Sequence, residues 1–186
     1  LVLIFPSEDR VDVLPYFFAP KENAFIRSRR DGIDYLGWEK KGLMQLTDGD
    51  VTDYNFVKAK VKELAEKFIV KSIAYDRWNS SQLVIDLLSA PVKEIERRVL
   101  AKQLNHGGNE VLRWMCSNLQ MRLDPAGNIK MDKGKSKEKI DGMVSLAMAL
   151  GRMMNPDDKS YWKLWHLYLI YLEKRKRELI TFSRQH

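Results

Sequence analysis

Apolar residues recur along this chain in two patterns, one typical of β-strands and one typical of α-helices. The alternation of these two patterns restricts the fold more than any other feature of the sequence. Residues 1–5 and 11–18 are β-branched and aromatic runs separated by a short polar turn, which predicts a β-hairpin. Asp53 suits the N-cap of a helix, and residues 71–76 are a predicted strand that ends in an acid. Another helix is expected at 79–88. Strand, helix, strand and helix in succession indicate an α/β fold.

The predicted helix after residue 53 has an apolar face formed by Phe56, Val57, Val61, Leu64, Ala65 and Phe68. Further helices are expected at 23–30, 34–41, 91–102 and 109–118, with a short strand at 43–46. Gly32 separates the first two of these helices. A second hairpin joins 119–123 to 129–131 through a turn that contains Pro125 and Gly127, because these residues adopt turn dihedral angles readily.

The clearest helical stripe lies near the end of the chain. It consists of Ile140, Met143, Val144, Ala147, Leu150 and Met154, which predict a helix over 136–154 with one face on the core. After a linker at 155–158, an aromatic and leucine-rich segment is expected to form a separate helix that packs on the domain or on another chain. We therefore expect one domain at 1–155, followed by a linker and helical appendage at 156–186.

Charge and cysteine content narrow the class of protein. The chain has 32 Lys and Arg against 25 Asp and Glu, a net charge of +7, which favours polyanionic partners such as nucleic acid. A solubilising surface charge is the alternative. The single Cys116 excludes an internal disulfide and a cysteine-rich zinc site, as expected of a reduced, cytosolic protein. No apolar run approaches the ~20 residues that span a bilayer, so no membrane partner is expected.

Two carboxylates give the strongest indication of chemistry. Asp76 stands where a predicted strand ends, and Asp141 stands early on the predicted helix with the apolar stripe. Two carboxylates at the edge of a sheet repel one another unless a cation lies between them, and Mg²⁺ and Mn²⁺ prefer such oxygen ligands. Two such metals can activate water and stabilise the leaving oxygen in phosphodiester hydrolysis. The alternative is that both acids only stabilise helix N-termini.

A run of lysines precedes Asp141. It comprises Lys130, Lys133, Lys135, Lys137 and Lys139. Because phosphate must approach the metals here, we expect these lysines to contact the DNA backbone, although a solvated charged face is the alternative. Gly142 permits close approach of a ligand or, equally, tight packing.

Other sites are less well supported by their residue patterns. Asp48, Asp50 and Asp53 lack the glycine and glutamate that a calcium loop requires, and no phosphate-binding loop of an ATPase is present. The three histidines show no metal-ligand spacing. Cys116 is expected to be a small core residue rather than a nucleophile.

Four segments, in this order, resemble the nuclease domain of phage terminase large subunits. They are VLPYFF at 13–18, IAYDRWN at 73–79, LRWMCSN at 112–118, and DPAGNIK at 124–130 leading to KEKIDG at 137–142. The resemblance covers most of residues 1–155 and does not extend to the tail.

The resemblance implies a ribonuclease-H-like fold, a mixed β-sheet flanked by helices, with an extra C-terminal helix in this chain. It also implies an acidic cluster that binds two Mg²⁺ or Mn²⁺ ions and cuts concatemeric viral DNA. Asp76 and Asp141 match two of the family's acids, and Arg77 and Asn79 flank the first of them, where Arg77 is expected to contact DNA. The implied partners are double-stranded DNA, the terminase small subunit, the portal protein and an upstream ATPase domain, in the host cell cytoplasm.

The sequence departs from the family pattern in two places. The family's first acid lies just upstream of the strand that residues 1–5 resemble, so we expect a protein starting at Leu1 to hold its metals less well. Family members also carry a longer stretch between the elements that match Leu88 and Pro91. The alternatives in function are a resolvase- or integrase-like nuclease and a non-catalytic module for DNA binding or motor docking.

Overall fold

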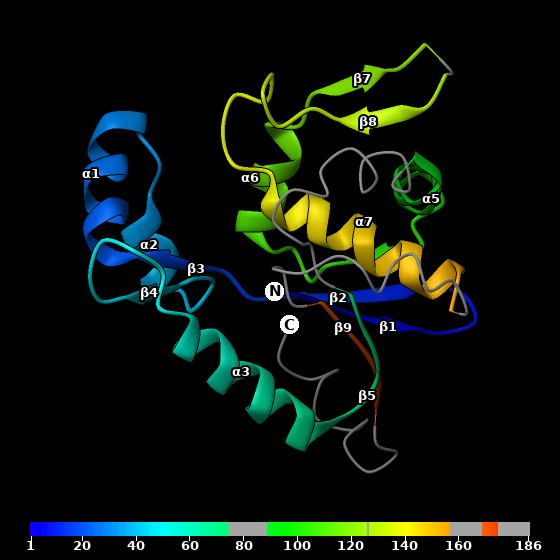
Figure 1. Ribbon diagram of the computed structural model, residues 1–186, viewed down its shortest axis with the longest axis horizontal. Coiled ribbons are helices and arrows are strands. Elements are labelled where there is room, and N and C mark those ends of the chain that lie inside the picture. Colours follow the sequence, from blue (N-terminus) through cyan, green and yellow to red (C-terminus); the bar gives the residue numbers. More distant parts are fainter. Residues whose placement is uncertain (75–88, 126, 157–168, 175–186) are drawn as a thin grey trace.

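A five-stranded mixed sheet lies at the centre of the computed structural model, which describes residues 1–74, 89–125, 127–156 and 169–174. Its strand order is β5-β9-β1-β2-β6 (Figure 1). The strands are β1 Val2–Pro6, β2 Val11–Pro15, β5 Phe68–Ala74, β6 Leu104–Asn105 and β9 Leu169–Lys174. β1 and β2 form the predicted antiparallel hairpin, whereas β1 runs parallel to β9, and β2 runs parallel to β6. The predicted mixed sheet is therefore confirmed.

Strand β1 is apolar along its length because both of its faces are covered. Val2 and Ile4 belong to the larger core cluster, while Leu3 and Phe5 belong to a second cluster on the opposite face. All four side chains are buried. Successive side chains of a strand point to opposite faces, so a continuous hydrophobic run is what an internal strand requires.

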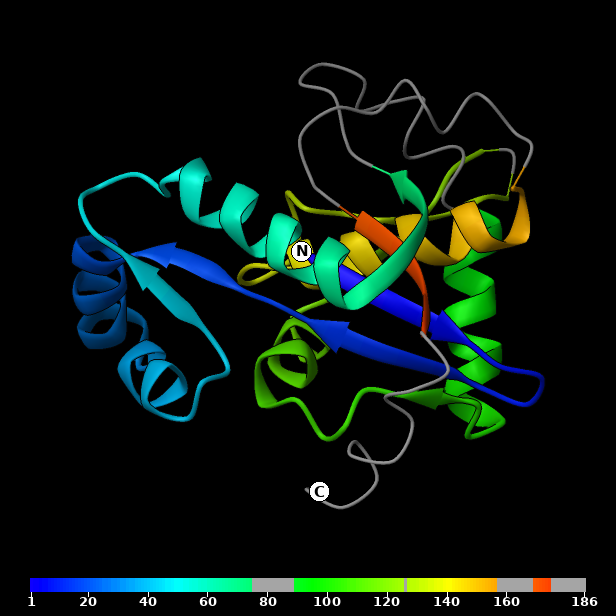
Figure 2. The same cartoon turned by 90° about the horizontal axis from the view of Figure 1, so that it is seen from below.

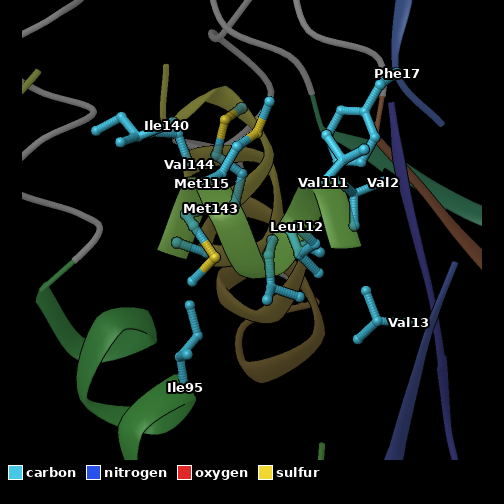
Figure 3. Close-up of a cluster of buried hydrophobic side chains, with 14 of the residues drawn as sticks. Val2, Val13, Phe17, Ile95, Val111, Leu112, Met115, Ile140, Met143 and Val144 are labelled. Carbon is cyan, nitrogen blue, oxygen red and sulfur yellow. The ribbon is translucent and has the colours of Figure 1, made fainter. Parts of the chain in front are cut away.

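Three helices cover one face of the sheet: α5 Ser89–Leu100, α6 Glu110–Ser117 and α7 Asp141–Met154 (Figures 1 and 2). In α7 every residue from Gly142 to Arg152 is buried. Figure 3 shows side chains of all three helices in one buried cluster that also contains Val2 and Val13 of the sheet. Five residues of the predicted stripe are buried as expected, but Met154 is 40% exposed. The expectation that only one face of this helix meets the core is wrong, because burial extends all round it from 142 to 152. α6 begins as predicted, since the Leu112 N–H donates to Asn109 Oδ1 (3.0 Å).

Helix α3, Tyr54–Lys67, packs near the edge strand β5 and begins at its predicted cap, where the Asn55 N–H donates to Asp53 Oδ1 (2.8 Å). Its apolar face is narrower than expected, because only Leu64 is fully buried and Phe56 is 38% exposed. Phe68 is the first residue of β5 rather than the last of this face. Its ring stacks edge-on with Phe5, so a contact to the sheet takes precedence over the helical pattern (5.0 Å between centroids).

A small lobe, defined here as residues 18–47, extends from the end of β2 (Figure 1). It contains β3 Phe18–Pro20, α1 Lys21–Asp31, α2 Tyr35–Lys40 and β4 Gln45–Thr47. β3 and β4 form a parallel two-stranded ladder separate from the main sheet. The two predicted helices are confirmed, and Gly32 ends the first with a left-handed φ of 68°.

The second predicted hairpin is present as β7 Met121–Leu123 and β8 Ile129–Met131. Its turn is closed by the Asn128 N–H, which donates to Asp124 Oδ1 (2.8 Å), and Gly127 has a φ of 79°. This is the turn chemistry that the sequence predicted.

The predicted start of the long helix at residue 136 is wrong, because α7 begins at Asp141. Asp132 explains the difference: its Oδ1 accepts from the N–H groups of Gly134 and Lys135 (3.0 and 3.1 Å). The hydroxyl of Ser136 also donates to the Asp132 carbonyl (2.6 Å). These local bonds hold 132–136 in a turn and compete with helix formation.

The predicted tail helix is wrong for Leu169–Lys174, which form strand β9. β9 pairs with both β1 and β5, so it satisfies backbone groups of the two neighbouring strands that the sheet would otherwise leave unpaired. Long-range pairing therefore overrides the local helical pattern. The predicted helix at 79–88 and the rest of the tail lie outside the described residues, and the division of the chain at residue 155 stays a prediction.

None of the helices in the described ranges has the length and apolar character needed to cross a membrane.

Candidate active site

Asp141 is the first residue of α7, and its neighbours hold it at the surface. Ile140, Met143 and Val144 are buried at 2%, 4% and 7% exposure. Because these side chains face the core, Asp141 faces outward, and its side chain is 44% exposed. A carboxylate in the first turn also lies at the positive end of the helix dipole. The apolar stripe therefore fixes an acidic group at the rim of the domain.

A lysine from the preceding loop contacts this carboxylate. Lys133 Nζ lies 3.1 Å from Asp141 Oδ1, and the lysine side chain is 54% exposed. Both partners reach solvent, so the pair contributes little stability. It does show that a cation can lie against Asp141 at hydrogen-bonding distance.

The loop that carries Lys133 is held in place although its lysines are exposed. We call residues 133–139 the lysine loop. The Gln120 N–H donates to Ser136 Oγ (3.2 Å), and the Asp132 N–H donates to the Gln120 carbonyl (2.8 Å). These bonds tie the loop to the segment that precedes β7. Four predicted DNA-binding lysines are exposed on it: Lys133, Lys135, Lys137 and Lys139.

The strand register identifies which edge of the sheet lies next to Asp141, where an edge means the side at which strand ends meet. Val2 is paired with Leu169, and Leu169 is paired with Ala74, so the start of β1 and the end of β5 lie at the same edge. Asp141 is at this edge too, because Leu1 and Asp141 line the same pocket.

Asp76 and Arg77 follow the end of β5 in sequence, but they lie outside the described residues, as does Asn79. Their positions relative to Asp141 therefore stay a prediction. Within the described ranges, no group of three or more His, Cys, Asp or Glu side chains is arranged to hold a metal ion.

A pocket of about 410 Å³ opens beside Asp141. Its walls come from the residue before β1, the segment after β2, the lobe, the start of α3, the lysine loop, and helices α6 and α7. Six aromatic side chains contribute to the lining: Tyr16, Phe17, Phe18, Tyr35, Tyr54 and Trp114. Sequence reasoning missed this pocket, because its aromatic residues come from unrelated segments and share no spacing.

Gly142 is explained by packing. An added Cβ at this position would lie 2.8 Å from Phe17 Cε1 and 2.9 Å from Met115 Sδ. The Gly142 N–H also points at the same sulfur (3.2 Å). Of the two expectations for this glycine, tight packing is the one observed, and it brings α6 and the segment after β2 close to the first turn of α7.

The structure also places three residues that the sequence analysis considered: Cys116, Asp53 and His106. Cys116 is exposed, so its expected place in the core is wrong; its neighbours Leu112 and Met115 take the inner face of α6. Asp53 caps α3, as predicted. His106 is partly buried, and burial lowers the pKa of its imidazole.

Comparison with known proteins gives this site a family. The family model described as "Terminase large subunit, endonuclease domain" matches residues 1–88 and 84–157. The terminase large subunit of Enterobacteria phage HK97 is 34% identical over 170 residues, covering 81% of this chain and 34% of that protein. Protein YmfN of Escherichia coli K12 is 26% identical over 164 residues, covering 76% of this chain and 36% of that protein.

The fold agrees with the sequence match. The crystal structure of the HK97 bacteriophage large terminase superimposes with a TM-score of 0.72 at 27% identity, covering 81% of this chain and 38% of that one. This chain thus spans about a third of the length of the curated relatives it matches. Its mixed sheet with flanking helices is the ribonuclease-H-like fold of terminase nuclease domains. The chain belongs to the terminase large subunit endonuclease domain family.

Proposed function

We propose that this chain is a metal-dependent DNA endonuclease domain that hydrolyses phosphodiester bonds with two divalent cations, held by Asp76 and Asp141. The observation that carries the proposal is the shared sheet edge. Ala74 ends β5 two residues before Asp76 in the sequence, and the start of β1, near Asp141, lies two strand spacings from β5, about 10 Å at the usual strand spacing. If both carboxylates project from this edge, as we propose, they would be within reach of a common pair of metal ions.

Asp141 suits a metal ligand in chemistry and exposure. Its oxygen atoms are half-exposed, and one of them already accepts a cation, the ammonium of Lys133. Carboxylate oxygen is the ligand type that Mg²⁺ and Mn²⁺ prefer. When bound, such a pair of ions supplies an activated water and stabilises the leaving oxygen. Asp141 would hold and orient the ions, and Lys133 would then be released toward the phosphate.

The lysine loop supports DNA as the substrate. Lys133, Lys135, Lys137 and Lys139 are exposed on a loop that leads directly into Asp141. Cation–phosphate contacts position a nucleic acid backbone without reading its sequence. We assign these lysines, together with Arg77, to the DNA backbone near the cut.

The relatives suggest the larger setting in which such a domain would act. The HK97 match is a phage terminase large subunit by name, and the matching crystal structure is titled as the HK97 large terminase. We propose that this domain cuts concatemeric double-stranded DNA within a packaging motor, in the host cell cytoplasm. Its partners there would be an ATPase domain of the same protein, a terminase small subunit and a portal protein.

A single substitution tests the catalytic proposal. Asp141→Asn should reduce cleavage of supercoiled plasmid in Mn²⁺ or Mg²⁺ by at least about 100-fold, because a neutral amide is a poor metal ligand. Gel assays of nicked and linear products, with circular dichroism to verify the fold, provide the measurement.

Glu110→Gln is the matched control. Glu110 is also the first residue of a helix, is 48% exposed and pairs with a lysine, Lys41, at 2.8 Å. It should lose no activity. Undiminished cutting by Asp141→Asn would exclude Asp141 from catalysis. No cutting by the wild type with either metal would favour the alternative of a non-catalytic DNA-binding module.

The lysine loop has its own test. Replacing Lys135 and Lys137 with Gln should weaken DNA binding and lower the slope of log K against log salt by about 1 for each lost phosphate contact. Fluorescence anisotropy at several salt concentrations measures this. The same change at Lys58 and Lys62, which are exposed on α3, is the control. An equal slope change in both double variants would indicate a general charge effect rather than a defined backbone contact.

A further inference from the structure

The pocket beside Asp141 has a composition that metal-ion catalysis alone does not require. Asp141 itself lines it, so any ligand in the pocket lies directly next to the proposed site of cutting. Tyr54 stands at the start of α3 with 54% of its surface exposed, and Trp114 of α6 is half-buried. These rings belong to different elements and line the same pocket of about 410 Å³. That volume is within the range of small-molecule sites.

Charge at the pocket favours a ligand that is both flat and anionic. Arg27 of the lobe and Lys139 of the lysine loop line the same pocket as the aromatic rings. Aromatic side chains stack on nucleobases of any sequence, and nearby cations neutralise the attached phosphates. A nucleotide satisfies both requirements, whereas a purely apolar ligand would leave the charges unused.

A buried hydroxyl supplies a polar contact inside the pocket. Ser145 lies one helical turn after Asp141 and is 1% exposed. Its Oγ has no hydrogen-bond partner among the described residues, although it lines the pocket. Buried hydroxyl groups are normally paired, because an unpaired one carries the cost of its desolvation. A ligand atom that bonds Ser145 Oγ would remove that cost.

We propose that this pocket binds one unstacked nucleotide of the DNA strand next to the phosphate that is cut. The base leaves the duplex and stacks among the aromatic rings, with Tyr54 at the rim, and one of its polar atoms bonds Ser145. Arg27 and Lys139 contact the adjacent phosphates. The proposal rests on the proposed nuclease function. The pocket would give the domain a second binding site for the DNA strand, beside the metal ions. This site would accept any base, because every base can stack on an aromatic ring.

A binding experiment tests the pocket without any cutting. A short single-stranded DNA with one 2-aminopurine is titrated against the protein in the absence of divalent metal, and stacking quenches the fluorescence of that base. Quenching is expected for the wild type and for Tyr54→Phe, which keeps the ring. Tyr54→Ala should weaken binding by about fivefold to a hundredfold, the range measured for loss of a stacked aromatic. Quenching by Tyr54→Ala equal to that of the wild type would overturn the proposal.

Phe56→Ala is the matched control, since Phe56 is an exposed aromatic residue on the same helix, two positions away, and does not line the pocket. It should bind as the wild type does. Ser145→Ala provides a second measure: it should not harm the fold, because it removes a buried hydroxyl without changing packing. It should weaken the binding of the 2-aminopurine strand in the same titration, because one hydrogen bond to the base is lost. An unchanged affinity would remove Ser145 from the site.

Cleavage assays separate this inference from the proposed function. If the wild type cuts DNA and Tyr54→Ala cuts it at the same rate with the same affinity, the pocket proposal fails and the nuclease stands. If the wild type cuts no DNA with Mg²⁺ or Mn²⁺, the nuclease proposal fails, while the quenching experiment still reports on the pocket.

Discussion

The two sides of the pocket beside Asp141 differ in how firmly the fold holds them. On one side is α7, in which every residue from Gly142 to Arg152 is buried. On the other side is the lobe, whose helix α1 has exposed Phe25 and Ile26 (47% and 59%) and contributes Ala24 to the core. The ladder beneath α1 has only three residue pairs. The acid thus stands at the start of a helix that is buried from 142 to 152, whereas α1 on the facing wall is lightly packed. The rest of the lobe is anchored by Tyr35, Trp38 and Met44, which belong to the core.

This contrast fits the demands of the proposed chemistry. Metal ligands must be held within a fraction of an ångström, which a buried helix provides. The opposite wall must admit and release a DNA strand, and segments with few buried contacts open locally at low free-energy cost. We therefore expect changes in α7 to reduce global stability, and changes on the outer face of the lobe to leave it nearly intact.

Truncation of α7 in the core should have the largest effect. Leu146 is 1% exposed and belongs to the larger core cluster. Leu146→Ala should lower the free energy of unfolding by about 2–5 kcal/mol, through lost burial and the cavity left behind. Urea denaturation followed by circular dichroism measures it.

Ile26→Ala on α1 is the lobe counterpart to that variant. Its side chain is 59% exposed, so the free energy of unfolding should change by less than about 0.5 kcal/mol. A loss from Ile26→Ala comparable to that from Leu146→Ala would show that the lobe is as integral to the folded state as α7, and the contrast between the two walls would disappear.

The sequence predicted most of the elements because their signals are local. The cap at Asp53, the break at Gly32 and the turn at 124–128 each act within a few residues, and all three are observed. The errors occurred where residues distant in the sequence determine the secondary structure. β9 is a strand because β1 and β5 pair with it from both sides. Its six residues carry no local signal of that pairing.

The site was predictable to a similar extent. The position of Asp141 follows from the apolar stripe, since burial of Ile140 and Val144 leaves the intervening acid outward. The pocket did not follow from the sequence, because Tyr54 and Trp114 are sixty residues apart and meet only through the fold. Convergence of Asp76 with Asp141 stays a prediction.

A smaller loss of stability is expected at the point where the two walls meet. In Gly142→Ala the new Cβ would overlap Phe17 Cε1 at 2.8 Å and Met115 Sδ at 2.9 Å, with Leu112 Cδ1 at 3.1 Å. Overpacking of this kind costs about 1–3 kcal/mol, and the better helix propensity of alanine offsets up to about 1 kcal/mol. We expect a net loss of about 1–2 kcal/mol by urea denaturation.

Gly134→Ala is the control for Gly142→Ala, since its nearest neighbour is Asp132 Oδ1 at an ordinary 3.4 Å, and it should be neutral within about 0.5 kcal/mol. Phe17 also lines the pocket, so relief of the overlap moves a pocket wall as well as the first turn of α7. Gly142→Ala should therefore impair cleavage more than its stability loss explains. An unchanged stability in Gly142→Ala would mean that the side chains of Phe17 and Met115 move aside at little cost. The packing around α7 would then be more easily deformed than its burial indicates.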